Sequence, residues 1–102
     1  MLAVGGTADA QDGADAQSAQ RLFDQFADPG SEFRTKPFMV WNTEITPHRI
    51  DRILSEYKEQ GCGGVFIHPR LGLITEYLSP TWNEMVKYTV DKGRDLGLEV
   101  WL

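Results

Sequence analysis

The sequence of 102 residues contains a single cysteine, Cys62, and no long apolar run. One cysteine cannot close a disulfide within the chain, and it excludes a zinc site built from several cysteines. The apolar runs stay well short of the roughly 20 residues that a membrane-spanning helix needs, so we expect no membrane span. No Lys or Arg precedes Arg21 and the net charge is −5. The chain therefore lacks the basic surface that attracts nucleic acid, and we expect no nucleic-acid partner.

Residues 1–20 differ from the rest of the chain because they are rich in Ala, Gly, Asp and Gln and contain no aromatic residue. Such a segment cannot bury enough apolar surface to offset its chain entropy. Ala8-Asp9-Ala10 has the form of a signal-peptidase site, but the basic region and long apolar core of an export signal are missing. We interpret residues 1–20 as a disordered leader or the remnant of an export signal. A short helix and a linker are predicted over residues 21–36.

Two well-marked helices are predicted in the remaining two thirds of the chain. The pair Thr46-Pro47 supplies an N-cap and a proline at the first helical position, and Gly61 is expected to end that helix. Ser79-Pro80 and Gly97 repeat the same signals for the second helix. Apolar residues recur at helical spacing in both segments, which predicts one buried face on each helix.

Three continuous apolar runs begin near residues 38, 65 and 98 and have the composition of strands buried on both faces. Their alternation with the helices is typical of parallel strands joined by right-handed crossovers. Repeats of about 30 residues match a TIM (β/α)8 barrel, so we interpret residues 37–102 as its first three strands and two helices. The chain stops at Leu102 inside an apolar run, which suggests an α/β barrel truncated in its third strand. Three strands leave half of such a core open, so we expect this piece to fold poorly alone.

Polar side chains are predicted at the carboxyl ends of the first two strands, which is where parallel α/β folds bind ligands. His68 and Arg70 follow the second strand, and Asn42 and Glu44 follow the first. An imidazole, a guanidinium and an amide can hydrogen-bond sugar hydroxyls or a carboxylate. Tyr77 lies on the loop after the second strand and could offer an aromatic face for stacking.

Each of these residues also has an ordinary structural interpretation. His68 could be held by a backbone carbonyl, Arg70 could pair with Glu76, and Asn42 could satisfy backbone groups of a turn. Glu44 precedes a helix N-terminus, where a negative charge is favourable without any ligand.

The aromatic residues and glycines near these strands are expected to be structural. Trp41 and Trp101 are expected in the core rather than as sugar platforms. The pair Gly63-Gly64 precedes a strand, whereas a phosphate-binding loop follows one, so nucleotide binding is rejected. No residue spacing matches a metal site.

Four segments together resemble the opening of the catalytic barrel of a bacterial glycoside hydrolase of the family 106 α-L-rhamnosidase type. These segments are VWNTEIT at 40–46, GGVFIHPR at 63–70, YLSxxW at 77–82 and LGLEVWL at 96–102. The resemblance covers roughly residues 35–102. It implies a secreted or periplasmic, multidomain enzyme that hydrolyses glycosidic bonds of polysaccharides or oligosaccharides with inversion and with help from calcium.

The same resemblance implies roles for individual residues. Asn42, His68 and Arg70 would line the sugar subsite, with Glu44 and Tyr77 as further candidate substrate contacts. The family's catalytic acid and base are carboxylates on later strands, so we expect them beyond Leu102. The catalytic residues are therefore unknown here. We expect the fragment to be inactive alone, to contain no cofactor of its own, and to depend on the remainder of the barrel.

Two other interpretations stay open from the sequence. A small non-catalytic α/β module could bind an anion, a sugar or a protein partner through His68 and Arg70. A different barrel enzyme, such as an amidohydrolase, would need a metal-binding histidine pair on one strand, and the first strand has none.

Overall fold

The computed structural model describes residues 2–102, with side chains from residue 15 onward, and divides the chain into two compact units. The first unit, residues 1–30, contains helix α1 (Leu2–Ala27). The structure differs here from the expectation of a disordered segment before Arg21. Alanine and glutamine favour helices and no proline occurs before Pro29, which permits a helix over residues 2–27 although glycines lower its propensity. A role of residues 1–20 as a leader stays a prediction.

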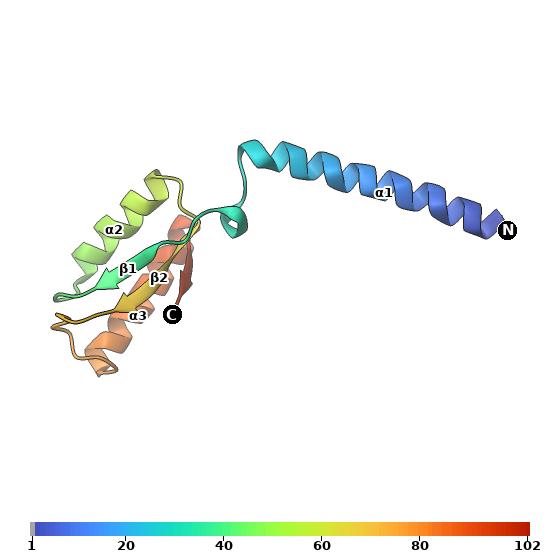
Figure 1. Cartoon of the computed structure of the whole chain (residues 1–102). Coiled ribbons are helices and arrows are strands. Elements are labelled where there is room, and N and C mark those ends of the chain that lie inside the picture. Colours follow the sequence, from blue (N-terminus) through green and yellow to red (C-terminus); the bar gives the residue numbers. More distant parts are fainter. Residues whose placement is uncertain (1) are drawn as a thin grey trace. The chain divides into compact units, whose positions relative to one another are not determined.

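The second unit, Ser31–Leu102, is a mixed α/β fold with a three-stranded parallel sheet (Figure 1). The β-α-β-α-β order predicted from the sequence is confirmed. Its elements, in chain order, are the 3-10 turn η1 (Ser31–Phe33), β1 (Phe38–Trp41), α2 (Pro47–Glu59), β2 (Gly64–Pro69), α3 (Pro80–Leu96) and β3 (Glu99–Trp101).

Both helices of this unit begin at the predicted caps. The hydroxyl of Thr46 accepts a hydrogen bond from the Arg49 amide at 3.3 Å, and that of Ser79 accepts one from the Trp82 amide at 3.1 Å. At the end of α3, Gly97 has φ of +73°, a left-handed conformation that glycine adopts without strain. These local signals fix where each helix begins, and thereby the lengths of the loops that follow the strands.

The strands add to the sheet in the order β1-β2-β3, with no reversal of direction. Phe38 pairs with Phe66, and Phe66 pairs with Trp101, so these three aromatic residues occupy one row across the sheet. Helices α2 and α3 contact each other on one face of the sheet and are linked by a 2.7 Å hydrogen bond from the Tyr88 hydroxyl to Asp51.

The hydrophobic core lies between the sheet and the two helices. The side chains that alternate along β1 and β2 toward the helices are buried, as period-two alternation requires. The core consists of Met39, Trp41, Ile45, Ile50, Leu54, Val65, Ile67, Trp82 and Leu98. Trp41 is 1% exposed and packs edge-on against Trp82, which confirms its predicted place in the core.

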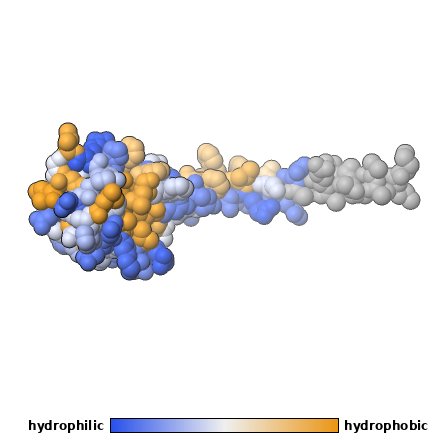
Figure 2. Space-filling model, turned by 90° about the horizontal axis from the view of Figure 1, so that it is seen from below, coloured by the Kyte–Doolittle hydropathy of each residue, from blue (hydrophilic) through white to orange (hydrophobic). Residues whose placement is uncertain are grey.

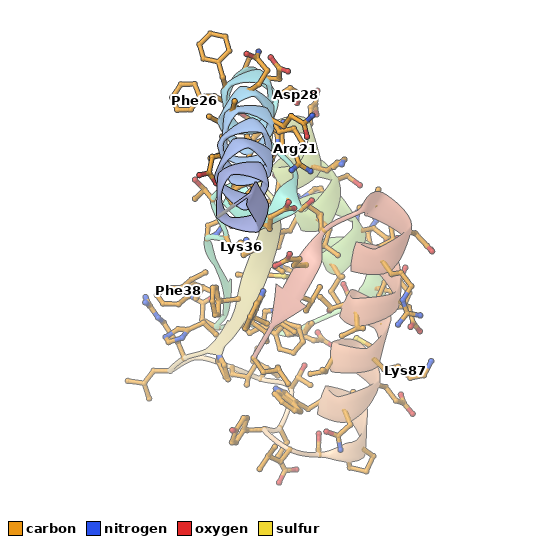
Figure 3. All side chains as sticks on the ribbon, turned by 90° about the vertical axis from the view of Figure 1, so that its right-hand side faces the viewer. Arg21, Phe26, Asp28, Lys36, Phe38 and Lys87 are labelled. Carbon is orange, nitrogen blue, oxygen red and sulfur yellow. The ribbon has the colours of Figure 1, made fainter. Side chains whose placement is uncertain are left out.

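The opposite face of the sheet is apolar but is not covered by a helix of the second unit. Phe38 projects from β1 away from α3 (Figure 3) and is 55% exposed. Phe66 touches both Phe38 and Trp101, with ring centroids 6.0 and 5.8 Å apart. Trp101 is 50% exposed, contrary to the expectation that it belongs to the core, because it lies on this face of an edge strand. We call these three residues, together with His68, the uncovered aromatic face.

Apolar side chains also reach the surface of the second unit outside this face (Figure 2). Leu71 is 99% exposed and Ile74 is 71% exposed, and both lie on the loop after β2.

At the other end of the sheet, Glu99 at the start of β3 pairs with Lys36 at 3.5 Å. That carboxylate therefore has a structural partner.

Candidate functional site

The candidate site is the edge of the sheet formed by the loops at residues 42–46 and 70–77, which we call the rim. These loops follow the carboxyl ends of β1 and β2 and stay side by side beyond the strands. The amide of Arg70 donates to the carbonyl of Trp41 at 3.0 Å, and the amide of Ile74 donates to the carbonyl of Thr43 at 3.3 Å. The rim is thus a continuation of the parallel pairing, and it brings residues from both strands together.

His68 lies on the uncovered aromatic face, where Val40 is its pairing partner on β1. Its imidazole stacks on the ring of Phe38, with centroids 4.6 Å apart and planes inclined by 24°. Within residues 2–102 the structure shows no hydrogen bond from the His68 side chain to a backbone carbonyl. An aromatic ring rather than a carbonyl therefore orients the imidazole, and both ring nitrogens remain available to a ligand.

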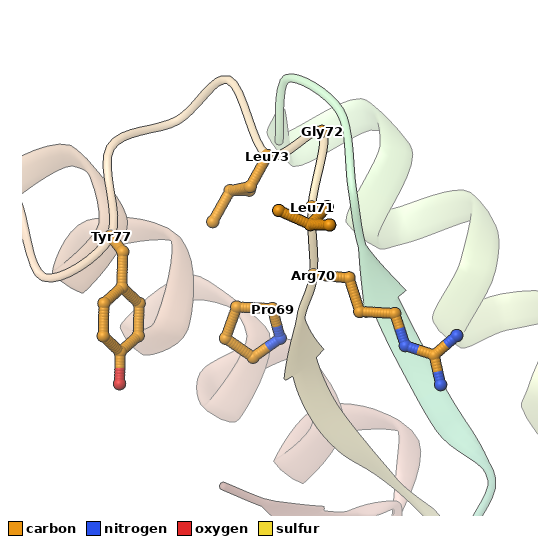
Figure 4. Close-up of a pocket in the computed structure, with 6 residues that line it drawn as sticks. All are labelled: Pro69, Arg70, Leu71, Gly72, Leu73 and Tyr77. Atoms are coloured by element: carbon orange, nitrogen blue, oxygen red, sulfur yellow. The ribbon is translucent and has the colours of Figure 1, made fainter.

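Asn42 and Arg70 stand one position beyond the last paired residues, Trp41 and Pro69, so they are neighbours across the two strands. Both are exposed. The ion pair between Arg70 and Glu76 that the sequence allows is not formed among the described residues. The guanidinium of Arg70 instead extends over β1 (Figure 4). Asn42, His68 and Arg70 alternate with the core residues, and together they form the polar end of the uncovered face.

Tyr77 shares an open hollow of about 520 Å³ with Arg70. Pro69, Leu73 and other residues of the β2–α3 loop also line this hollow, whereas Asn42 and His68 do not. In Figure 4, Tyr77, Pro69 and Leu73 lie on one side of the end of β2, whereas the Arg70 guanidinium points to the other side. The Tyr77 ring packs edge-on against Trp82 at 5.1 Å and is 58% exposed. Tyr77 can offer a face to a ligand in the hollow that Arg70 also lines.

Glu44 is exposed on the loop between β1 and α2, two residues before the Thr46 cap. It forms no ion pair or hydrogen bond with another described residue. Its position fits the favourable placement of a negative charge ahead of a helix N-terminus, which was the structural interpretation of this residue. The rim carries two exposed carboxylates, Glu44 on the first loop and Glu76 on the second.

Thr75 is a rim residue that sequence reasoning missed. It is 8% exposed, and its hydroxyl accepts a hydrogen bond from the amide of Ile45 at 3.0 Å. A lone threonine in a loop gives no signal in the sequence, because its importance depends on a partner 30 positions away. Phe38 was also missed as a partner of His68. The sequence signal for this contact was the two-residue alternation of β1, which places Phe38 on the same face as Val40, the pairing partner of His68.

Two side chains on α3, Tyr88 and Asp91, have shifted pKa values. The hydrogen bond from the Tyr88 hydroxyl to Asp51 raises the pKa of that phenol. The Lys87 ammonium, which hydrogen-bonds Asp91 at 2.9 Å, lowers the pKa of that carboxyl. Both shifts arise from surface pairs that support the helix, so they give no reason to place acid–base chemistry on α3.

No group of three or more metal-ligating side chains occurs among the described residues. Calcium takes six to eight oxygen ligands, and this part of the chain does not assemble such a set. No step of a mechanism is therefore assigned to calcium, which stays an expectation drawn from the resemblance.

No described helix combines the length and the apolar character that crossing a membrane requires.

Neither a scan against models of known protein families nor a search of curated proteins finds a match to this chain. The geometry of the rim and the uncovered face therefore carries the functional argument.

Proposed function

We propose that the second unit is the opening part of a (β/α)8 barrel of a secreted or periplasmic glycoside hydrolase, and that its rim supplies sugar-binding residues. The observation that carries the proposal is the grouping of Asn42, His68 and Arg70 at the carboxyl ends of two adjacent parallel strands. Active sites of (β/α)8 enzymes lie at this end of the barrel.

The strand order is compatible with a barrel. The order β1-β2-β3 continues in one direction, and α2 and α3 pack on the same face. Successive units of a barrel have this arrangement, and so does one half of a doubly wound sheet, whose order reverses only at its centre. The resemblance to a glycoside hydrolase barrel is our reason for choosing the barrel.

The uncovered aromatic face supports the same conclusion. A barrel interior is filled by side chains from its own strands, so those side chains are apolar although no helix covers them. The row of Phe38, Phe66 and Trp101 matches this requirement, since its rings contact one another across all three strands. Toward the carboxyl ends of the strands the same face becomes polar, with His68, Asn42 and Arg70. The transition from an apolar interior to a polar rim fits a ligand bound at the mouth of a barrel.

The rim residues can bind a sugar but cannot by themselves hydrolyse a glycoside. The Arg70 guanidinium donates hydrogen bonds, while the Asn42 amide and the His68 imidazole can donate and accept them. Inverting hydrolysis needs two carboxyl groups roughly 6.5–9.5 Å apart, one as acid and one as base. The rim loops carry Glu44 and Glu76, but the resemblance implies that the acid and base are carboxylates on later strands. We therefore assign them to strands outside these residues, with α-L-rhamnosides as the first substrate class to test.

The test is the activity of the product of the complete reading frame. We expect that frame to encode further strand–helix units with carboxylates at strand ends, and the purified product to hydrolyse an aryl α-L-rhamnoside. Arg70→Ala should lower kcat/KM by about tenfold or more, the loss expected when one charge-assisted hydrogen bond to the sugar is removed. A frame that stops at codon 102, or a full-length product without glycosidase activity, contradicts the proposal.

A second candidate function is a small α/β binding module that takes an anion. The exposed Arg70 guanidinium favours it, since no described acidic side chain pairs with this charge. Titration with sodium acetate and with methyl α-L-rhamnoside separates the two functions. A module that binds anions responds to acetate and loses the response at high salt, whereas a sugar subsite responds to the uncharged glycoside at any salt concentration.

A further inference from the structure

Two threonines of the second unit are buried, and their hydroxyl groups have different kinds of partner. Thr89 is fully buried, and its hydroxyl donates to the carbonyl of Met85 at 2.7 Å, within its own helix. The hydroxyl of Thr75 instead accepts from the amide of Ile45, which belongs to the other rim loop. Thr75 therefore joins two segments of the chain, whereas the hydroxyl of Thr89 bonds only to its own helix.

The backbone amide of Ile45 is buried and held in place, so it must have a hydrogen-bond acceptor within the protein. The Ile45 side chain is 7% exposed in the core, and the next residue, Thr46, is the N-cap of α2. The Ile45 amide is thus held between a core side chain and a helix end. A buried amide without an acceptor is costly, so loss of the Thr75 hydroxyl would favour movement of the β1–α2 loop.

The residues on either side of Asn42 are hydrogen-bonded to the β2–α3 loop. The residue before it accepts from the Arg70 amide, and Thr43 after it accepts from the Ile74 amide. Gly72 also packs against Asn42, since a Cβ at that position would come within 2.8 Å of the Asn42 carbonyl oxygen. The backbone of Asn42 is therefore constrained by the same loop that carries Arg70 and Thr75.

We propose that Thr75 is a positioning residue for the sugar subsite: through the Ile45 amide it holds the β1–α2 loop against the β2–α3 loop and thereby fixes Asn42 beside Arg70. This inference rests on the proposed function, because it names the residue that sets the geometry of the same rim. Thr75 does not contact the sugar. It acts on affinity by keeping two hydrogen-bonding groups at a constant separation.

The test compares Thr75→Val, Thr75→Ser and Thr89→Val in the 102-residue chain. Valine has nearly the shape of threonine without the hydroxyl, serine keeps the hydroxyl, and Thr89→Val makes the same chemical change at a buried site away from the rim. Amide hydrogen exchange of residues 42–45 reports loop order. Amide NMR shifts during titration with methyl α-L-rhamnoside report affinity.

We expect Thr75→Val to raise the dissociation constant about tenfold, since one buried hydrogen bond contributes on the order of a factor of ten. Exchange at residues 42–45 should become faster while exchange in β2 is unchanged. Thr75→Ser should bind within about twofold of the wild type, and Thr89→Val should leave binding unchanged, because neither change removes the Ile45 acceptor.

Two results overturn the proposal. One is unchanged affinity in a folded Thr75→Val variant, and the other is equal loss of affinity in Thr75→Val and Thr89→Val, which shows a general effect on stability. A wild-type chain that binds no glycoside contradicts the proposed function instead. In that case the exchange of residues 42–45 alone decides whether Thr75 holds the loop.

Discussion

The imidazole of His68 lies against the phenyl ring of Phe38, with ring centroids 4.6 Å apart, on the face of the sheet that neither α2 nor α3 covers. This contact joins β1 and β2 at the point where the apolar row of the face meets the polar rim. It orients the imidazole without occupying either of its nitrogen atoms. A ligand at the rim would therefore meet a histidine that is already in place.

Replacement of Phe38 by leucine tests this contact. Leucine keeps an apolar side chain but has no ring current, so the His68 ring protons should move downfield in the proton NMR spectrum. The loss of stability should be about 1–2 kcal/mol, because Phe38 contacts two rings, those of His68 and Phe66. His48 is a control within the same molecule, since it has no aromatic contact among the described residues. Identical His68 shifts in both proteins would show that the rings are not stacked.

The uncovered aromatic face should make the isolated chain bind hydrophobic dyes. Exposed apolar patches bind 8-anilinonaphthalene sulfonate, and Phe38 and Trp101 are each about half exposed. We expect the double variant Phe38→Ser/Trp101→Ser to reduce dye fluorescence severalfold. Leu71→Ser is the control, because Leu71 is 99% exposed on a loop and lies outside the face. Equal reductions in both variants would argue against a distinct apolar face.

Gly93 should be intolerant of any side chain. A Cβ at Gly93 would come within 2.6 Å of a Val100 methyl group, where α3 packs on β3. We expect Gly93→Ala to lower the free energy of unfolding by about 1–3 kcal/mol, as overpacked cores do, despite the better helix propensity of alanine.

Gly13→Ala is the matched control for this change. Gly13 lies in helix α1, and a Cβ added there would meet no atom within 4 Å, so only the propensity effect applies. We expect more helical circular dichroism and no change in the unfolding of the second unit. A Gly93→Ala variant as stable as the wild type would show that α3 and β3 are not closely packed.

The stability of the second unit should fall at high pH because of Tyr88. The hydrogen bond to Asp51 raises the pKa of the Tyr88 phenol in the folded state, so the folded chain holds this proton more tightly than the unfolded chain. The contribution is complete below the ordinary tyrosine pKa of about 10 and is lost as the pH rises above it.

Urea unfolding at several pH values measures this effect. Tyr88→Phe should fall less steeply above pH 10 than the wild type, whereas Tyr77→Phe should keep the steeper fall. The prediction fails if Tyr88→Phe and the wild type have parallel pH profiles.

The order and type of the elements in the second unit could be predicted because local chemistry determines them. Thr46-Pro47 and Ser79-Pro80 mark helix starts through backbone geometry and capping, and both helices begin there. The strands were recognised from continuous apolar runs, and Trp41 is in the core as expected. The barrel, in contrast, depends on strands outside these residues and stays a prediction.

The details of the site depended on contacts between distant residues. Tyr77 was grouped with His68 and Arg70 because all three lie near the end of β2. In the structure Tyr77 and Arg70 line one hollow after β2, whereas His68 stacks on Phe38 within the sheet. Trp101 was expected to be buried because aromatic residues usually are, yet β3 is an edge strand of a sheet with one open face. Thr75 could not be identified, since its partner Ile45 is joined to it only by the folded loops.

The central claim is that the rim binds a sugar, and an amide NMR titration of the 102-residue chain with methyl α-L-rhamnoside tests it most directly. We predict shifts confined to residues 42–46 and 68–73, with an affinity about tenfold lower in Arg70→Ala and unchanged in Arg52→Ala, an exposed arginine on α2. Absent shifts, or equal shifts in the two arginine variants, would contradict a sugar site at this rim.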